Sequence, residues 1–217
     1  MIRFPDPRSA DEYGVVAVGG DLELETLIEA YRHGIFPWPI DDFPLFWFSP
    51  EKRAILEFDK LHVSRSLERA RKKSALTFTF DKTFHEVITA CARMKRPDQE
   101  GTWIRPDVID AYTEFHRLGY AHSIEAWSGD RLVGGLYGVD VDGAFGGESM
   151  FYIVPNASKL LLLDLVDHLR ERGLDWMDLQ VMTPHMERLG ATVISRDEFL
   201  DRLTKTRAKR LHLFPRA

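Results

Sequence analysis

Three polar side chains near the ends of two apolar runs are the strongest candidates for chemistry. Asp178 and Gln180 end one strand-like run, where alternation would point both side chains to one face. Glu148 follows two glycines on another such run, where an unpaired buried charge would be costly. Carboxylates in such positions hold cations or accept protons. A structural salt bridge is the simpler interpretation of each acid taken alone.

A basic stretch follows the acidic N-terminal quarter of the chain. The net charge is −5, and residues 1–50 hold nine Asp or Glu against three Arg. Residues 52–73 reverse this balance, with eight Lys or Arg against three Asp or Glu. Binding of phosphate requires local positive charge rather than a positive total. The stretch therefore allows contact with a nucleic acid, although a solvated helix face is the simpler interpretation of a charge run alone.

The cysteine and histidine content argues against a metal centre. Cys91 is the only cysteine, which excludes an internal disulfide and a thiolate metal cluster. It continues an apolar helical stripe with Val87 and Ile88, so we predict a core position for it. His185 has no metal-ligating residue at a convincing spacing, and we interpret it as a structural hydrogen-bonding residue. We expect neither a metal nor a cofactor.

The composition is that of a soluble enzyme. Of the 217 residues, 44% are hydrophobic and 29% are charged, and 14 Phe and 5 Trp are available for a core. No apolar run approaches the roughly 20 residues that span a bilayer. Residues 1–6 lack the basic and apolar blocks of a secretion signal. We expect a cytoplasmic protein without membrane contact.

The apolar pattern predicts an α/β fold with an antiparallel meander in the middle. Asp21 is a candidate N-cap for a helix that ends at Gly34, and Asn156 for a later, long helix. Prolines and aromatic residues at 35–50 predict an irregular segment and a domain boundary near Pro50. Strands are predicted at residues 54–58, 76–80, 122–127, 131–139, 144–152, 174–181 and 191–195, and helices at 64–72, 84–94, 157–172, 184–189, 197–204 and from 106.

Four segments, in this order, closely resemble the leucyl/phenylalanyl-tRNA–protein transferase family. They are GGDL at residues 19–22, YRHGIFPW at 31–38, GTWI at 101–104 and GESMF at 147–151. Supporting matches are WFSP at 47–50, HVSRS at 62–66, AHSIE at 121–125, LVGGLYG at 132–138, NASK at 156–159 and DLQ at 178–180. Each motif alone is weak, but the ordered set is specific and runs from about residue 15 to residue 200.

The resemblance implies a two-domain α/β (α+β) architecture. A small N-terminal domain would comprise residues 1–50. A catalytic domain similar to the GNAT acyltransferase fold, with a mixed, largely antiparallel central sheet, would comprise residues 51–217. The acyl donor would be aminoacyl-tRNA in place of acetyl-CoA. Independently of the family, residues 154–159 lack the Gly-rich pyrophosphate loop that acetyl-CoA enzymes carry at this point.

The resemblance also implies the reaction. Leucine or phenylalanine, and methionine less well, would pass from charged tRNA to the N-terminal α-amine of proteins that begin with Arg or Lys. The product would be marked for degradation as an N-degron. Exchange of an ester for an amide runs downhill, so ATP and metal ions are not required. Since an α-amine has a pKa of about 7.7–8.0, alignment of the amine with the ester supplies much of the catalysis.

The resemblance assigns the reacting and acceptor-binding residues. Asp178 and Gln180 would hold the acceptor amine and assist removal of its proton, and Leu179 between them would face away. Glu148 would help to bind the cationic acceptor. Trp38 and Trp103 would lie beside the acceptor and the terminal adenosine of the tRNA.

The resemblance assigns the donor-binding residues as well. An apolar aminoacyl pocket would be lined by Leu136, Phe145 and Met150, although a plain core position is an equal alternative for the first two. Leu136 replaces a Met and Phe48 a Trp of the family pattern, so the ranking of Leu, Phe and Met stays open. The acceptor stem of the tRNA would contact a basic helix that presents Arg65, Arg69, Arg71, Lys72 and Lys73, of which only Arg65 matches residue for residue.

Three other functions compete with this interpretation. The first is a GNAT-like transferase that uses acyl-CoA, which the missing pyrophosphate loop disfavours. The second is a non-catalytic reader of basic N-termini, which would not need the basic helix. The third is a transferase for acidic N-termini, which two neighbouring carboxylates disfavour. We expect a monomer.

Overall fold

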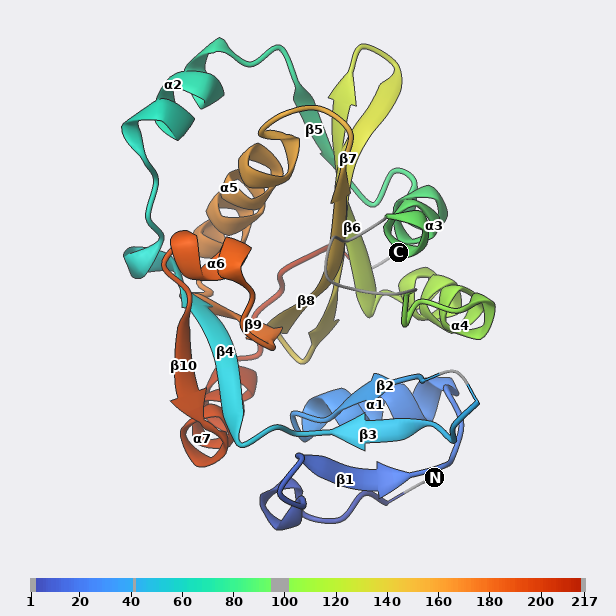
Figure 1. The fold of residues 1–217 in the computed structure, drawn as a ribbon. Helices are drawn as coiled ribbons and strands as arrows, with labels where there is room; N and C mark the ends of the chain where they lie inside the picture. Colours follow the sequence, from blue (N-terminus) through green and yellow to red (C-terminus); the bar gives the residue numbers. More distant parts are fainter. Residues whose placement is uncertain (1–2, 41, 95–101, 216–217) are drawn as a thin grey trace.

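Two β-sheets form the framework of the protein. The computed structural model describes residues 3–40, 42–94 and 102–215. The larger sheet has seven strands in the order β10-β4-β9-β8-β7-β6-β5 (Figure 1). Its strands are β4 (Lys52–Glu57), β5 (Thr77–Phe80), β6 (Ala121–Ser128), β7 (Arg131–Val141), β8 (Ala144–Tyr152), β9 (Trp176–Gln180) and β10 (Thr192–Ser195). These bounds agree with the predicted strands to within a few residues.

One pair of neighbouring strands in this sheet is parallel. All other neighbours are antiparallel, whereas β8 and β9 run in the same direction. Their register consists of the single pair Gly146 and Asp178. The predicted α/β class with a mixed, largely antiparallel central sheet is confirmed. Beyond this pair, side chains rather than backbone bonds join the two strands.

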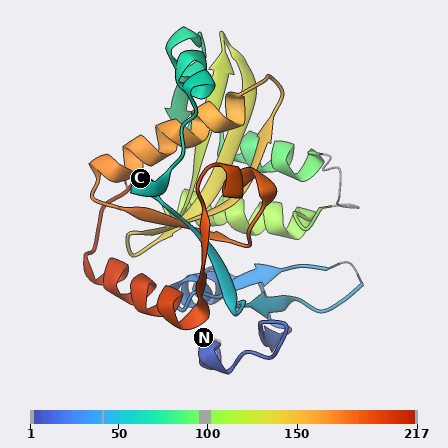
Figure 2. The ribbon, with the colours of Figure 1, turned by 60° about the vertical axis from the view of Figure 1, so that its left-hand side comes forward.

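Helices cover both faces of the seven-stranded sheet. On one face lie α3 (Phe84–Arg93) and α4 (Pro106–Arg117), and on the other lies α5 (Ala157–Glu171), as Figures 1 and 2 show. The helix α5 buries nine of its residues, including four consecutive leucines, because it lies between the sheet and the outer helix α2 (Arg65–Lys73). Two separate apolar clusters result, one on each face.

The small sheet corrects the prediction for residues 35–50. The sequence predicts an irregular segment here, but the segment contains β2 (Phe36–Trp38) and β3 (Phe46–Phe48). These strands pair with each other, and β3 also pairs with β1 (Val15–Val18), in the order β1-β3-β2. Pro37 is tolerated because β2 is an edge strand, where a missing N–H breaks no interior ladder.

The N-terminal segment shares a core with the large sheet. Leu27 on α1 (Leu24–Arg32), Ile35 and Trp47 belong to the same apolar cluster as the buried faces of α3 and α4. The helix α1 also contacts α4 and β7. A division of the chain into domains near residue 50 stays a prediction.

The structure differs in detail from the prediction at two helix N-termini. Glu23 rather than Asp21 is the N-cap of α1, and the Oδ1 of Asp21 accepts hydrogen bonds from Glu23 N and Thr26 Oγ1 instead. Asn156 does precede α5, but it has a left-handed backbone with φ 66° and makes no side-chain capping bond. No helix in the described residues is long and apolar enough to cross a membrane.

The C-terminal part of the chain completes the layers. The short helix α6 (Pro184–Arg188) follows β9 and is capped by Thr183, and α7 (Arg196–Ala208) packs against β4 and β10. Between α6 and β10, Gly190 turns the chain with φ +94°, and a Cβ atom there would lie 2.2 Å from the carbonyl oxygen of Lys60.

Gly190→Ala is expected to destabilise the protein more than Gly119→Ala does. Both glycines have a positive φ, but a Cβ atom at Gly119 would meet nothing within 4 Å. Both substitutions incur the left-handed cost of about 1 kcal/mol, and only Gly190→Ala adds a clash, worth about 1–3 kcal/mol more. Urea unfolding of both variants measures the difference, and equal losses would contradict the close approach.

Candidate active site

A β-bulge places Glu148 at the centre of the site. Tyr137 pairs with Ser149 and the next residue, Gly138, pairs with Gly147, so Glu148 is an extra residue in β8. A bulge re-aims a side chain that regular alternation would send elsewhere. The Oε1 atom of Glu148 accepts hydrogen bonds from Tyr31 Oη at 2.8 Å and from Gln180 Nε2 at 2.6 Å.

A second bulge shapes the end of β9. Ala54 pairs with Gln180 and Ile55 with Asp178, which leaves Leu179 unpaired. Gln180 has a left-handed backbone with φ 62°, a conformation that costs a residue with a side chain on the order of 1 kcal/mol. Its backbone N–H donates to Asp178 Oδ1 at 2.9 Å. The backbone of Gln180 therefore contacts the carboxylate of Asp178 through a bulge and a left-handed residue, and not through the simple alternation that the sequence predicts.

Arg53 is a member of the site that sequence reasoning did not identify. Its guanidinium, 2% exposed, binds both carboxylate oxygens of Asp178, with Nε–Oδ1 2.8 Å and Nη2–Oδ2 2.6 Å. It donates to the carbonyl oxygen of Gly34 at 3.1 Å and lies between the rings of Phe36 and Phe199. The sequence placed Arg53 only in a basic stretch, because a charge run carries no information on burial.

A pair of tyrosines supports Glu148 from the opposite side. Tyr31 on α1 and Tyr112 on α4 have hydroxyl oxygens 2.5 Å apart. Since Tyr31 donates to Glu148, Tyr112 donates to Tyr31, and the carboxylate is the end of a two-step chain. Burial, and then the charge of Glu148, raises the pKa of both tyrosines, so both keep their protons. Tyr31 lies in the YRHGIFPW motif, but no sequence signal showed that Tyr112 would reach it.

The environment raises the pKa of Glu148 to about 7. Burial is the largest cause, and the nearby charge of Asp178 adds to it. Hydrogen bonds from Tyr31 and Gln180 and the charge of Arg53 act in the opposite direction. At neutral pH the carboxyl group is therefore poised between its two protonation states, which suits proton transfer.

The predicted acceptor-side tryptophans meet as a stacked pair. The rings of Trp38 on β2 and Trp103 before α4 have centroids 5.9 Å apart and an interplanar angle of 24°. Trp103 is buried, whereas Trp38 keeps partial exposure. Both pack on the cluster that contains Tyr112, on the α3 and α4 face. Gly101 of the GTWI motif lies outside the described residues.

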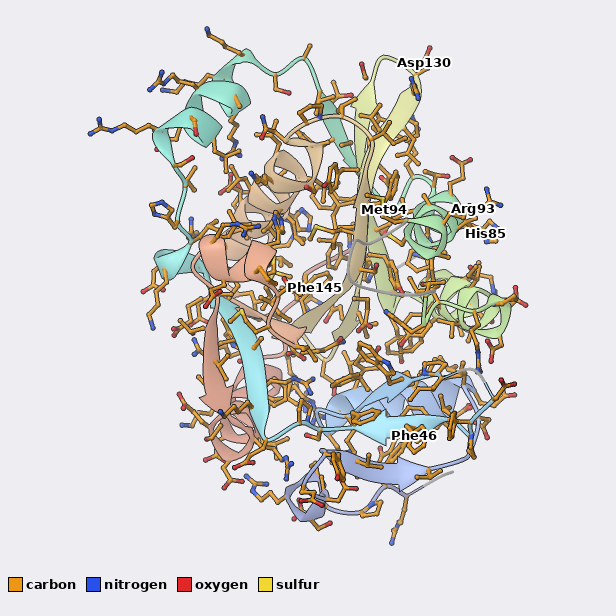
Figure 3. All side chains as sticks on the ribbon, in the orientation of Figure 1. Phe46, His85, Arg93, Met94, Asp130 and Phe145 are labelled. Carbon is orange, nitrogen blue, oxygen red and sulfur yellow. The ribbon has the colours of Figure 1, made fainter. Side chains whose placement is uncertain are left out.

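The predicted aminoacyl-pocket residues lie on the other face. Leu136 and Phe145 are 2% exposed in the cluster beneath α5, and Met150, which pairs with Leu136 across β7 and β8, packs on it with partial exposure. Figure 3 shows Phe145 on the side of α5 and α6. The structure therefore separates these three residues from Trp38 and Trp103 by the sheet. Leu179 packs on the same cluster as these three residues.

The predicted tRNA-binding residues are exposed on α2. Ser64 caps this helix, Leu67 points inward, and the basic side chains extend away from the molecule (Figure 3). Arg71 is engaged in part, because it binds Asp167 on α5 at 2.5 Å. The exposed set is Arg65, Arg69, Arg71, Lys72 and Lys73.

Cys91, His185 and a group of possible metal ligands lie outside this site. Cys91 is buried in the core, as predicted. The Nε2 atom of His185 is buried without a hydrogen-bond partner in the described residues, so the predicted bond is not made there. Asp81, His116 and His122 offer ligand atoms within 4.8 Å of one another. Hydrogen bonds already occupy these groups, since His122 Nδ1 lies 2.7 Å from Asp81 and His116 Nδ1 2.8 Å from a backbone carbonyl.

Comparison with known proteins gives a consistent result. The family description "Leucyl/phenylalanyl-tRNA protein transferase" matches residues 55–204, and its "N-terminal domain" counterpart matches residues 20–51. A protein of Anaeromyxobacter sp. (strain K) named "Leucyl/phenylalanyl-tRNA--protein transferase" is 50% identical over 202 residues, which cover 93% of this chain and 87% of the relative. One from Maridesulfovibrio salexigens with the same name is 49% identical, with 92% and 84% covered.

Solved structures show weaker similarity. The structure of L-PGS from Bacillus licheniformis matches with 15% identity and a TM-score of 0.44, over 75% of this chain and 52% of that one. A functionally unknown conserved protein from Staphylococcus epidermidis matches with 10% identity and a TM-score of 0.44, over 66% and 57%.

Arg53→Met is expected to lower the free energy of unfolding by about 3–5 kcal/mol, because it leaves Asp178 largely buried without its partner. The double substitution Arg53→Met/Asp178→Leu should cost less than Arg53→Met alone, since it removes both charges. Arg8→Met is the control, because Arg8 pairs with Asp197 at the surface and should cost less than about 1 kcal/mol. Urea unfolding measures all three, and a loss at Arg53 as small as that at Arg8 would contradict the buried ion pair.

The raised pKa of Glu148 should make stability depend on pH. The folded value of about 7 exceeds the ordinary 4.5, so the folded state binds the proton more tightly than the unfolded state. This contribution is complete below pH 4.5 and is lost as the pH rises through 7. Thermal unfolding across this pH range should show that Glu148→Gln loses less stability with rising pH than the wild type does. Glu25→Gln, at an exposed glutamate, is the control. An unchanged loss in Glu148→Gln would refute the shift.

Proposed function

The chain belongs to the leucyl/phenylalanyl-tRNA–protein transferase family, and from this premise we propose which reaction it performs and how. The enzyme is an aminoacyltransferase. It transfers leucine or phenylalanine, and methionine less well, from charged tRNA to the N-terminal α-amine of proteins that begin with Arg or Lys. The product is a substrate for degradation as an N-degron, and the enzyme acts as a cytoplasmic monomer.

The observation that carries this proposal is the poised carboxyl group of Glu148. The α-amine attacks the ester carbonyl of the aminoacyl-tRNA, a C–N bond forms, and the C–O bond to the terminal ribose breaks. The amine loses a proton, and the ribose hydroxyl gains one. The carboxylate of Glu148, a proton acceptor with a pKa of about 7, is matched to an α-amine with a pKa of about 7.7–8.0.

The hydrogen bonds around Glu148 leave one oxygen for the substrate. Tyr31 and Gln180 both bind Oε1. Within the described part of the chain, no hydrogen-bond donor contacts the Oε2 atom of Glu148. We assign this oxygen to the acceptor amine, and Tyr31 and Gln180 to positioning the carboxylate.

Asp178 has a different part in this scheme. Arg53 occupies both of its oxygens and the backbone of Gln180 binds one of them, so the carboxylate is held as an anchor. Asp178 fixes the left-handed turn that aims Gln180 at Glu148. The alternative, with Asp178 and Gln180 removing the proton themselves, requires Asp178 to leave Arg53.

The surroundings of the two acids supply the specificity. Because Arg53 already balances the charge of Asp178, the negative charge of ionised Glu148 is what favours an acceptor with a basic first residue. The stacked pair of Trp38 and Trp103 borders the acceptor side. Leu136, Phe145 and Met150 on the α5 face receive the apolar side chain of the donor. The tRNA lies against the five exposed cations of α2, whose contacts to phosphate give affinity without base readout.

The two runner-up functions predict different donors. A GNAT-like N-acyltransferase would bind acyl-CoA, and a reader of basic N-termini would bind its ligand without transfer. The match to both parts of the family, together with the exposed basic helix, favours the tRNA-dependent reaction.

Transfer of radiolabelled leucine from Leu-tRNA tests the proposal. The wild type should label a model protein that begins with Arg but not one that begins with Glu. Glu148→Gln should lower kcat by about 10²–10⁴-fold, the usual contribution of a proton-transfer residue. Glu25→Gln should retain full activity, since its side chain is exposed on α1.

Two other outcomes are informative. If Glu148→Gln stays active and a folded Asp178→Ala is inactive, the roles of the two acids must be exchanged. If neither protein is labelled from Leu-tRNA or Phe-tRNA, the transferase assignment is wrong, and acyl-CoA donors should be tested.

A further inference from the structure

A cavity of about 360 Å³ lies between α2, α5 and α6, outside the site described above. Four of its lining residues carry basic side chains, namely His62, Lys159, His185 and Arg188. The hydroxyl groups of Ser64 and Ser66 and the amide of Asn156 add neutral hydrogen-bonding groups. No Asp or Glu is among the lining residues, so the cavity favours an anion.

The two permanent cations of this cavity are unpaired. Arg53, Arg71, Arg202 and Arg207 each bind a carboxylate. Lys159 and Arg188, in contrast, form no ion pair with any residue that the structure describes. Their positive charge is therefore available to a ligand.

The buried nitrogen of His185 points to a missing partner. Its Nε2 atom has no hydrogen bond within residues 3–40, 42–94 and 102–215. Buried polar atoms are nearly always paired, because an unpaired one loses its hydration without compensation. Burial, followed by the charges of Lys159 and Arg188, lowers the pKa of this imidazole, because a third positive charge beside these cations is unfavourable. An anion would supply the partner and offset the cations.

The N-terminal ends of two helices add to the positive electrostatic potential of the cavity. The helices α2 and α5 both begin at the cavity. The first turn of α5 has no acidic residue and no side-chain cap, and although the N–H of Ala157 donates to the carbonyl oxygen of Val154, the positive end of the helix dipole still favours an anion. Two permanent cations, two histidines of which one has the unpaired buried nitrogen, and a helix terminus without a side-chain cap thus converge on one volume.

We propose that this cavity binds a phosphate group, and that its occupant is a backbone phosphate of the tRNA near its aminoacylated end. The identity of the occupant rests on the proposed function. Ser64 and Ser66 line the cavity at the start of α2, so the cavity adjoins the helix that carries the exposed cations. His185 is five residues after Gln180, a length of chain that spans at most about 18 Å. The phosphate would thus hold the donor end of the tRNA next to Glu148.

The affinity for deacylated tRNA, measured by fluorescence anisotropy at several salt concentrations, tests the proposal. Lys159→Ala and Arg188→Ala should each weaken binding about threefold or more at moderate salt. Each should also reduce the slope of log K against log salt by about one unit. Lys205→Ala is the matched control, because Lys205 is an exposed cation on α7, far from α2 and α6 (Figure 1). Affinities and slopes equal to those of this control would overturn the proposal.

The nitrogen resonances of His185, followed by NMR, distinguish the sources of phosphate. Inorganic phosphate should shift them in the wild type but not in Lys159→Ala/Arg188→Ala, and deacylated tRNA should compete. If coenzyme A shifts them and tRNA does not compete, the cavity is a nucleotide site and the RNA assignment is overturned. Deacylated tRNA cannot react, so its binding tests the cavity separately from the reaction. If the wild type transfers no amino acid but still binds tRNA through this cavity, the proposed function is wrong and the phosphate site remains.

Discussion

The ion pair between Arg53 and Asp178 is the interaction on which the rest of the site depends. A guanidinium that is 2% exposed is stable only where its donors and its charge are satisfied. Here the Asp178 carboxylate, the Gly34 carbonyl and two aromatic faces provide this. These partners come from β9, the end of α1, β2 and α7, so one side chain on β4 fixes four separate parts of the chain.

The ion pair also determines how Glu148 is presented. Asp178 holds the backbone of Gln180, and the side chain of Gln180 holds Glu148. The backbone pairing of β8 and β9 ends at Gly146 and Asp178, so this chain of side-chain bonds takes the place of a ladder. Tyr31 and Tyr112 complete it from the other side of the sheet, where burial keeps both hydroxyl groups protonated.

The sequence predicts the regular parts of this arrangement and not the irregular ones. Helical and alternating patterns place α5 and the strands β6 to β8 well, because burial imposes a period on every residue of those elements. The bulges at Glu148 and Leu179 leave no such period, since each depends on the register of a distant strand. The sequence shows Arg53 only as a member of a charge run, which fits either nucleic-acid contact or a solvated face, because its partner Asp178 lies 125 residues away. Pro37 suggested an irregular segment, although an edge strand accepts it.

The position of Phe199 on α7 has a consequence for the order of synthesis. This ring covers Arg53, yet Phe199 is synthesised 146 residues after Arg53. A chain that ends before α7 would lack one of the two aromatic faces that cover the guanidinium, so water would reach Arg53 and weaken its bond to Asp178. The ion pair that organises the site therefore depends on a side chain that lies later in the sequence than Glu148, Asp178 and Gln180.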